Sequence, residues 1–314
     1  MVACRSATMP NLTVAIAPAS RPTAVLEYEE EDMTIGVGTW LITGAARGLG
    51  FEMAREVLRR GGRVAAAVRN PDMAIDALKA AASGLDQLFV IPINLEDASS
   101  VNSAVERACA HFGGLDVLVN NAGYGLLGAV EEAADDEVEA VFRVNVFGPH
   151  RLIRAALPVL RKSAAARVVN ISSLGGFAAS AGWGIYNATK FALEGLSEAL
   201  AIEGASFGLR VVIVEPGAFR TGFLTTSSLR RARRMIDQYA TTVGRTRTGA
   251  EQRNGQQRGD PVAAARVIVD AVVSAEPPLR LVLGADAIER VETKLESVRR
   301  DVDAWRAQSI STGY

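Results

Sequence analysis

The sequence predicts an α/β protein with a doubly wound, mostly parallel seven-stranded sheet and helices on both faces. Seven short, continuous apolar runs recur along the chain, and segments with helical periodicity lie between most of them. Parallel strands that are covered on both faces have this continuous apolar character. The hydrophobic fraction of 49% is enough to build a core of that size. The runs are TWLITG (39–44), RVAAAV (63–68), LFVIPI (88–93), DVLVNNAG (116–123), RVVNISS (167–173), RVVIVEPG (210–217) and LRLVLG (279–284).

The length of 314 residues fits one large domain that occupies residues 36–314. Residues 1–35 combine Pro, Ser, Thr and an acidic stretch, which predicts a disordered N-terminal extension in which Met33 could be the true start. The segment from about 222 to 260 breaks the rhythm of runs and helices and is too long for an ordinary connection, so we expect a lid at the rim of the site. Ile288 to Trp305 has the pattern of an amphipathic helix with alternating charge.

The composition excludes several classes of protein. A formal net charge of -1 gives no electrostatic reason for a nucleic-acid partner. The sequence contains no run of 18 apolar residues, so it predicts no membrane span. Cys4 and Cys109 do not form a disulfide framework, and the isolated His111 and His150 predict no metal site, so a cytoplasmic location fits best.

The stretch LITGAARGLG (41–50) lies between a predicted strand and a predicted helix, the context that a dinucleotide-binding loop requires. Gly44 permits a sharp turn out of the strand, while Gly48 and Gly50 carry no side chain that would keep a pyrophosphate away. The N–H groups and the positive dipole end of the following helix would then point at the phosphates.

The spacing of these glycines is TGxxxGxG, which resembles the short-chain dehydrogenase/reductase family. Further motifs follow in that family's order and spacing, and the resemblance covers roughly residues 38–220, with a looser fit to 285. It implies a Rossmann-type fold and an oxidoreductase that uses a nicotinamide cofactor. The further motifs are NNAG (120–123), VNVFG (144–148), ISS (171–173), YNATK (186–190) and EPGAFRT (215–221).

Three residues are predicted to react. Tyr186 and Lys190 are four residues apart and share one face of a helix, where the ammonium should lower the pKa of the phenol. Ser173 precedes the tyrosine by thirteen residues and follows a predicted strand, so its hydroxyl could stabilise charge on a substrate oxygen. The resemblance assigns the three residues these same roles. The alternatives are a surface Tyr/Lys pair and a strand-end serine, and no G-x-S-x-G motif of a hydrolase surrounds Ser173.

Asn145 is a further candidate catalytic residue. It shares helical spacing with Val138 and Val141 on a face that should be buried, and a buried amide needs hydrogen-bond partners. The resemblance implies that this asparagine holds a water that links the lysine to solvent. The alternative is a core asparagine with a purely structural role.

The predicted cofactor is NADP(H), with NAD less favoured. The end of the second strand normally carries an acidic residue that binds the ribose hydroxyls, but Val68 occupies that position. Arg69 follows it and Arg47 precedes Gly48, and two guanidinium groups suit a phosphate monoester. The alternative is that Arg69 is a solvated charge, and Arg47 is the weaker indication of the two.

The resembled family often has aspartate near the adenine, where this chain has Asn94. An amide can still bind the adenine amino group, with Leu95 supplying its backbone. No metal ligand is predicted. The predicted cofactor-binding residues are Gly44, Arg47, Gly48, Leu49, Gly50, Arg69, Asn94, Leu95, Asn121, Ala122, Gly123, Tyr186, Lys190, Pro216, Gly217 and Thr221.

The predicted function is hydride transfer between NADP(H) and a carbonyl or secondary alcohol, as a ketoreductase acting on a lipophilic small molecule. The alternative is a catalytically silent NADP(H)-binding redox sensor. The resemblance implies a homodimer or homotetramer formed by the helices that carry Asn145 and Tyr186. Apolar walls of the substrate site, or merely core residues, are Tyr124, Leu174, Trp183, Phe219 and Phe223. A run of arginines at 230, 231, 233 and 234 could attract an acidic substrate, but we expect it to be the solvated face of a lid helix.

Overall fold

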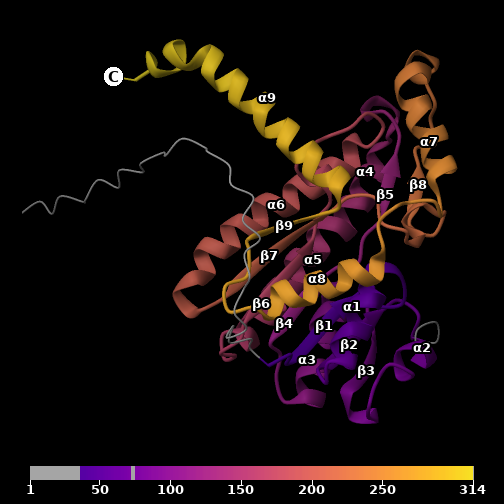
Figure 1. The fold of residues 1–314 in the computed structure, drawn as a ribbon. Coiled ribbons are helices and arrows are strands. Elements are labelled where there is room, and N and C mark those ends of the chain that lie inside the picture. Colours follow the sequence, from indigo (N-terminus) through magenta and orange to yellow (C-terminus); the bar gives the residue numbers. More distant parts are fainter. Residues whose placement is uncertain (1–35, 72–74, 314) are drawn as a thin grey trace, which may run out of the picture. The chain divides into compact units, whose positions relative to one another are not determined.

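The computed structural model describes residues 36–71 and 75–313. The predictions for residues 1–35, including the start at Met33, lie outside the described residues. Seven strands form one sheet in the order β3-β2-β1-β4-β6-β7-β9, and every neighbouring pair is parallel (Figure 1). The predicted fold class is confirmed. The strands are β1 (Thr39–Thr43), β2 (Arg63–Val68), β3 (Leu88–Pro92), β4 (Val117–Asn120), β6 (Arg167–Ile171), β7 (Arg210–Pro216) and β9 (Arg280–Leu283).

Helices cover both faces of the sheet. One core cluster joins the sheet to α1 and α8, and a second joins the opposite face to α3, α5 and α6. Among the helices of the described residues, none combines the length and apolar character needed to cross a bilayer. The helices are α1 (Gly48–Arg59), α2 (Ile75–Lys79), α3 (Ala98–Phe112), α4 (Asp135–Phe142), α5 (Gly148–Leu160), α6 (Gly184–Gly204), α7 (Arg245–Arg253), α8 (Pro261–Val273) and α9 (Ala285–Ile310).

Local signals in the sequence set the ends of several helices. Asp97 caps α3 by accepting a hydrogen bond from Ser99 N at 2.9 Å, and Asp260 caps α8 through Val262 N at 2.8 Å. The helix α3 ends at Gly113, whose φ of 78° is the left-handed conformation that glycine adopts most readily. These caps set where α3 and α8, the crossover helices before β4 and β9, begin and where α3 ends.

The segment after residue 222 carries structure that the sequence did not reveal. It contains β8 (Leu229–Arg231), which pairs in parallel with β5 (Gly125–Leu127) as a separate two-stranded sheet. Both strands have only three residues, too few to show an apolar period. Residues 229–231 therefore form a strand because they pair with the distant strand β5, and not because of a local sequence pattern.

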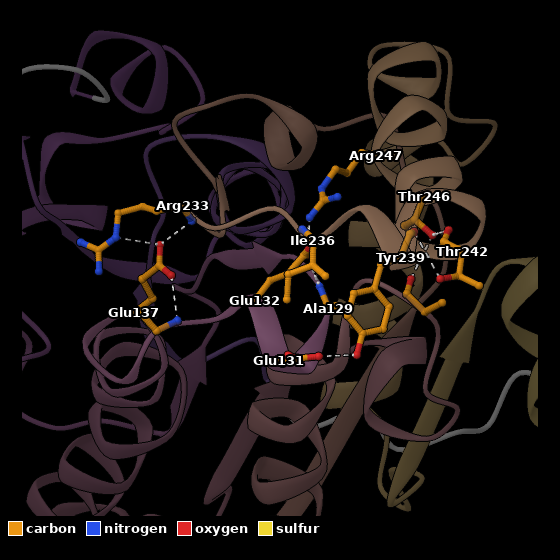
Figure 2. A network of polar contacts seen from close by, with 12 residues as sticks. Ala129, Glu131, Glu132, Glu137, Arg233, Ile236, Tyr239, Thr242, Thr246 and Arg247 are labelled. Carbon is orange, nitrogen blue, oxygen red and sulfur yellow. Dashed lines mark hydrogen bonds and ion pairs between the residues drawn. The ribbon is translucent and has the colours of Figure 1, made fainter.

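Glu132 anchors that segment to the body of the domain (Figure 2). Its buried carboxylate accepts hydrogen bonds from Ala129 N at 2.7 Å and Ile236 N at 2.9 Å, and it forms an ion pair with Arg247. Burial alone would raise the pKa of Glu132, but these donors outweigh it and hold the pKa below its ordinary value. Nearby, Glu131 accepts a bond from the hydroxyl of Tyr239 at 2.9 Å.

The variant Glu132→Gln should loosen the segment from 229 to 253, because it removes the charge that faces Arg247. Hydrogen bonds to charged groups contribute about 1.5–3 kcal/mol, so amide exchange in that segment should accelerate about 10- to 100-fold. The pKa of Glu132 is lowered on folding, so its stabilisation is present at neutral pH and is lost as the pH falls into the acidic range. Hydrogen-exchange mass spectrometry measures the effect, with Glu106→Gln, an exposed glutamate of α3, as the control. Equal exchange in the two variants would contradict this role.

Candidate active site

Hydrogen bonds join the carboxyl ends of β1 and β4. The hydroxyl of Thr43 donates to Val119 O at 3.1 Å and accepts from Asn121 N at 3.0 Å and Ala122 N at 3.1 Å. The side-chain amide of Asn121 donates to Thr43 O at 2.8 Å. These two strands are the switch point at which the strand order reverses, where doubly wound sheets bind their ligands.

The glycine loop has the geometry that a dinucleotide needs. Gly44 and Gly48 have φ values of 68° and 59°, a region that residues with side chains rarely adopt. A Cβ on Gly50 would lie 2.3 Å from Nδ2 of Asn121, so only glycine fits there. The helix α1 begins at Gly48 and directs its first N–H groups toward the loop. The loop and the start of the helix therefore fit a pyrophosphate.

A cavity of about 630 Å³ extends from this loop across the carboxyl edge of the sheet. Of the predicted site residues, Gly50, Asn94, Leu95 and Asn145 lie outside its lining. Gly50 and Leu95 are buried, whereas Asn94 is exposed and its side chain accepts from Glu96 N at 3.1 Å. The predicted residues that do line the cavity are Gly44, Arg47, Gly48, Leu49, Arg69, Asn121, Ala122, Gly123, Ser173, Tyr186, Lys190, Pro216, Gly217 and Thr221.

The two arginines at the cavity have different surroundings. Arg47 donates from Nη2 to Ser227 O and to Ser228 Oγ, both at 2.9 Å, so it ties the glycine loop to the inserted segment. Arg69 is exposed and immediately follows Val68, the buried last residue of β2. Arg69 is therefore the better placed of the two to meet a phosphate at the end of β2.

Ser173, Tyr186 and Lys190 come together at the carboxyl end of β6. Ser173 follows the strand and caps a short 3₁₀ turn by accepting from Gly175 N at 3.0 Å. Tyr186 and Lys190 lie one turn apart on α6, and both are buried. The Nζ of Lys190 lies 5.8 Å from the centre of the Tyr186 ring and donates to Ile171 O at 2.7 Å.

The expectation that the pKa of Tyr186 lies below its ordinary value is wrong for this structure. Burial raises the pKa of the phenol to about 12, and the Ser173 hydroxyl, hydrogen-bonded to the phenol, reverses only part of that effect. Burial also lowers the pKa of Lys190 to about 8, against the opposing charge of Glu194. The sequence showed the four-residue spacing but not how completely the fold removes both groups from water. At neutral pH the phenol is protonated and able to donate.

Asn145 lies behind the cavity in a π-helical turn, Arg143–Phe147, between α4 and α5. Its Oδ1 accepts from Tyr124 N at 3.1 Å, and its Nδ2 donates to Tyr124 O at 2.9 Å and to Thr189 Oγ1 at 3.1 Å. These bonds fit the structural alternative that the sequence left open. Oδ1 retains capacity for one further donor, and the water-holding role stays a prediction.

Aromatic side chains surround the Tyr186 phenol. The ring centres of Trp183 and Tyr186 lie 5.7 Å apart. The ring centre of Phe223, in the inserted segment, lies 5.6 Å from that of Tyr186. Tyr124, Phe219 and Phe223 line the cavity, whereas Leu174 and Trp183 stand outside its lining.

The arginine run forms contacts within the protein. Arg230 stacks over the ring of Tyr124 at 4.4 Å, Arg231 pairs with Glu251 at 2.7 Å, and Arg233 pairs with Asp136. The arginines are exposed, as expected, but the expected lid helix is wrong, because Arg230 and Arg231 belong to β8 and Arg233 and Arg234 follow it in a loop.

The sequence did not reveal a cluster of charged side chains behind the site, which consists of Glu194, Glu215 and Arg280. Arg280 lies 3.5 Å from the carboxylate of Glu194 and 3.3 Å from that of Glu215. Burial, helped by the charge of Glu194, raises the pKa of Glu215 to about 7, while Arg280 opposes the shift. Two signals could have revealed the cluster. Glu194 is one further turn along the helix face of Lys190, and Glu215 is a charge inside an otherwise apolar strand.

The variant Glu215→Gln should change how stability depends on pH. The folded-state pKa of about 7 lies above the ordinary value of 4.5, so the stability of the natural protein should fall as the pH rises from about 4.5 to about 7. The variant lacks this titration, so its stability should not show this fall. The difference in melting temperature, variant minus natural protein, should therefore become larger as the pH rises over that range. Differential scanning calorimetry between pH 5 and 8 measures this difference. Glu203→Gln, an exposed glutamate of α6, is the control, and a flat difference for Glu215→Gln would refute the shift.

Comparisons with known proteins identify the family. The sequence profile described as "short chain dehydrogenase" matches residues 39–232. Oxidoreductase BOA17 of Botryotinia fuckeliana is 32% identical over 273 residues, 87% of this chain and 98% of that protein. The 3-ketodihydrosphingosine reductase of Bacteroides thetaiotaomicron is 34% identical over 246 residues, 78% of this chain and 87% of that protein. The crystal structure of a short-chain dehydrogenase from Streptomyces avermitilis superposes with a TM-score of 0.82 at 39% identity, covering 88% of this chain and 99% of that one. The chain therefore belongs to the short-chain dehydrogenase/reductase family and is an NAD(P)-dependent oxidoreductase that acts on CH–OH or C=O groups.

Proposed function

We propose that the protein is an NADP(H)-dependent ketoreductase whose substrate is a lipophilic small molecule. The observation that carries the proposal is the protonated phenol of Tyr186 beside the Ser173 hydroxyl, in the cavity that begins at the glycine loop. A protonated phenol is suited to giving a proton to an oxygen that gains negative charge. That need arises in the direction of carbonyl reduction.

The residues of the site divide the work of that reaction. When bound, the reduced nicotinamide supplies the hydride. Ser173 donates a hydrogen bond to the carbonyl oxygen and stabilises its developing charge. Tyr186 then transfers its phenolic proton to that oxygen, and the Lys190 ammonium stabilises the phenolate that remains.

The preference for NADP(H) rests on the end of β2. Val68 offers no carboxylate that would repel a 2′-phosphate, and the exposed Arg69 lines the cavity directly after it. A guanidinium group and a phosphate form a charge-assisted pair of bonds. The glycine loop accommodates the pyrophosphate of either nicotinamide cofactor, so Arg69 decides between them.

Aromatic and aliphatic side chains near Tyr186 support a lipophilic substrate. Phe223 and Leu224 line the cavity from the inserted segment, and Phe219 lines it from the loop after β7. The reductase relative from Bacteroides thetaiotaomicron has a name that gives a keto compound as its substrate. We infer that residues 222–260 act as a lid over this apolar part of the cavity, with the Glu132 contacts as its attachment to the body.

The first test of this function is the variant Tyr186→Phe, which removes the proton donor and keeps the ring. The rate of NADPH oxidation with lipophilic ketones should fall about 10²- to 10⁴-fold, the usual contribution of a general acid. Absorbance at 340 nm measures turnover, and fluorescence measures NADPH binding, which should persist. Tyr239→Phe, which removes a phenol hydroxyl that binds Glu131 and does not line the cavity, is the matched control. Binding without turnover in the natural protein would instead support the redox-sensor alternative.

The cofactor preference has a separate test in Arg69→Asp. Loss of a charge-assisted phosphate contact of about 1.5–3 kcal/mol should reduce kcat/KM for NADPH about 10- to 100-fold. The new carboxylate can accept from ribose hydroxyls, so kcat/KM for NADH should rise. Arg266→Asp on the exposed face of α8 is the charge-matched control. An unchanged ratio of the two kcat/KM values would refute the assignment of Arg69.

A further inference from the structure

Most apolar side chains of the helix α9 are exposed in the part of the chain that the structure describes. The helix runs out from the end of β9 (Figure 1), and Ala287 is its one buried residue among those described. Its first turn is attached to the body, because Asp286 accepts from Ala218 N at 2.9 Å and Arg290 donates to Ala179 O. The remaining turns expose side chains that a stable soluble helix ordinarily buries.

Six apolar residues of α9, five of them exposed, have the spacing of a coiled-coil seam. They recur at alternating intervals of three and four residues, which is the a/d pattern of a heptad repeat over three heptads. The α9 seam consists of Ile288, Val291, Leu295, Val298, Val302 and Trp305. Ile288, Leu295, Val298, Val302 and Trp305 are 47%, 54%, 45%, 50% and 66% exposed. This seam needs an apolar partner of similar length.

The charges beside the seam indicate which partner fits. Glu292 and Arg299 flank the seam on one side, at e positions, and Lys294 and Asp301 flank it on the other, at g positions. A parallel pair of α9 helices would bring Lys294 against Arg299 of the partner subunit, which is repulsive. It would also bring Asp301 against Arg306 of the partner subunit, which is attractive, so the two contacts oppose each other. An antiparallel pair brings like heptad positions together. It places Glu292 beside Arg299 of the partner subunit, and Lys294 beside Asp301 of the partner subunit.

The apolar layers are compatible with the antiparallel arrangement and fix its register. In an antiparallel pair each a residue faces a d residue of the other helix. Only one register uses all six positions, with Ile288 on Trp305 of the partner subunit, Val291 on Val302 and Leu295 on Val298. In that register the attractive pairs Glu292–Arg299 and Lys294–Asp301 are the nearest flanking neighbours. Core and charges therefore agree on one geometry.

We propose that α9 is a dimerisation element that pairs with α9 of a second copy of this chain as an antiparallel two-helix coiled coil. The six layers would span about 26 Å, at about 1.5 Å per residue, with the two folded bodies at opposite ends. A membrane surface fits α9 less well. The helix carries six acidic and five basic residues and lacks the cationic face on which such binding depends.

The test measures self-association of the full-length protein by sedimentation velocity over a concentration series. The double variant Leu295→Glu/Val298→Glu should raise the dissociation constant of the α9 contact at least 100-fold, which halves the mass of the assembly at working concentration. Arg300→Glu, which changes a charge at an f position away from the seam, should leave the mass unchanged. An unaltered mass in the double variant, with its melting temperature retained, would overturn the proposal.

The orientation has its own experiment. Lys294→Asp and Asp301→Lys should each weaken self-association, because each places like charges together in the antiparallel pair. An equimolar mixture of the two variants should restore association, since every cross-pair is then attractive. In a parallel pair, Lys294→Asp would instead strengthen association by facing Arg299 of the partner subunit. That strengthening, or failure of the mixture to associate, would refute the antiparallel arrangement.

Discussion

The hydrogen bonds between Thr43 and the turn after β4 determine where the chemistry of this protein can occur. They hold the ends of β1 and β4 together, so the glycine loop and the NNAG segment share one edge of the sheet. All seven strands run in the same direction, and the segments after β6 and β7 therefore open onto that edge as well. Residues far apart in the sequence meet there because the sheet is parallel.

Burial decides the ionisation of the groups that meet at this edge. The Tyr186 phenol keeps its proton because the charged form would be desolvated, and the same effect weakens the hold of Lys190 on its proton. Behind them, Glu194, Glu215 and Arg280 place further charges inside the protein. The site is therefore an apolar environment with a few ionisable groups, in which each charge depends strongly on its neighbours.

Two parts of the molecule extend the common sheet in different ways. The inserted segment is fixed to the body through the buried carboxylate of Glu132 and contributes apolar lining to the cavity. The helix α9 contacts the loop after β7 through Asp286 and then exposes a regular apolar seam. The first part lines the site, and the second presents apolar side chains that the described residues leave exposed.

The sequence by itself determined the seven strands and the glycine loop, and it predicted Ser173, Tyr186 and Lys190 as the reacting residues, because apolar runs and fixed spacings are local properties. The tertiary structure alone revealed the pairing of β5 with β8, the cluster around Arg280 and the engagement of Arg47 by Ser227 and Ser228. It also reversed the expected pKa shift of Tyr186. Each of these depends on which distant groups lie together and how much water reaches them, and no spacing along a chain specifies either.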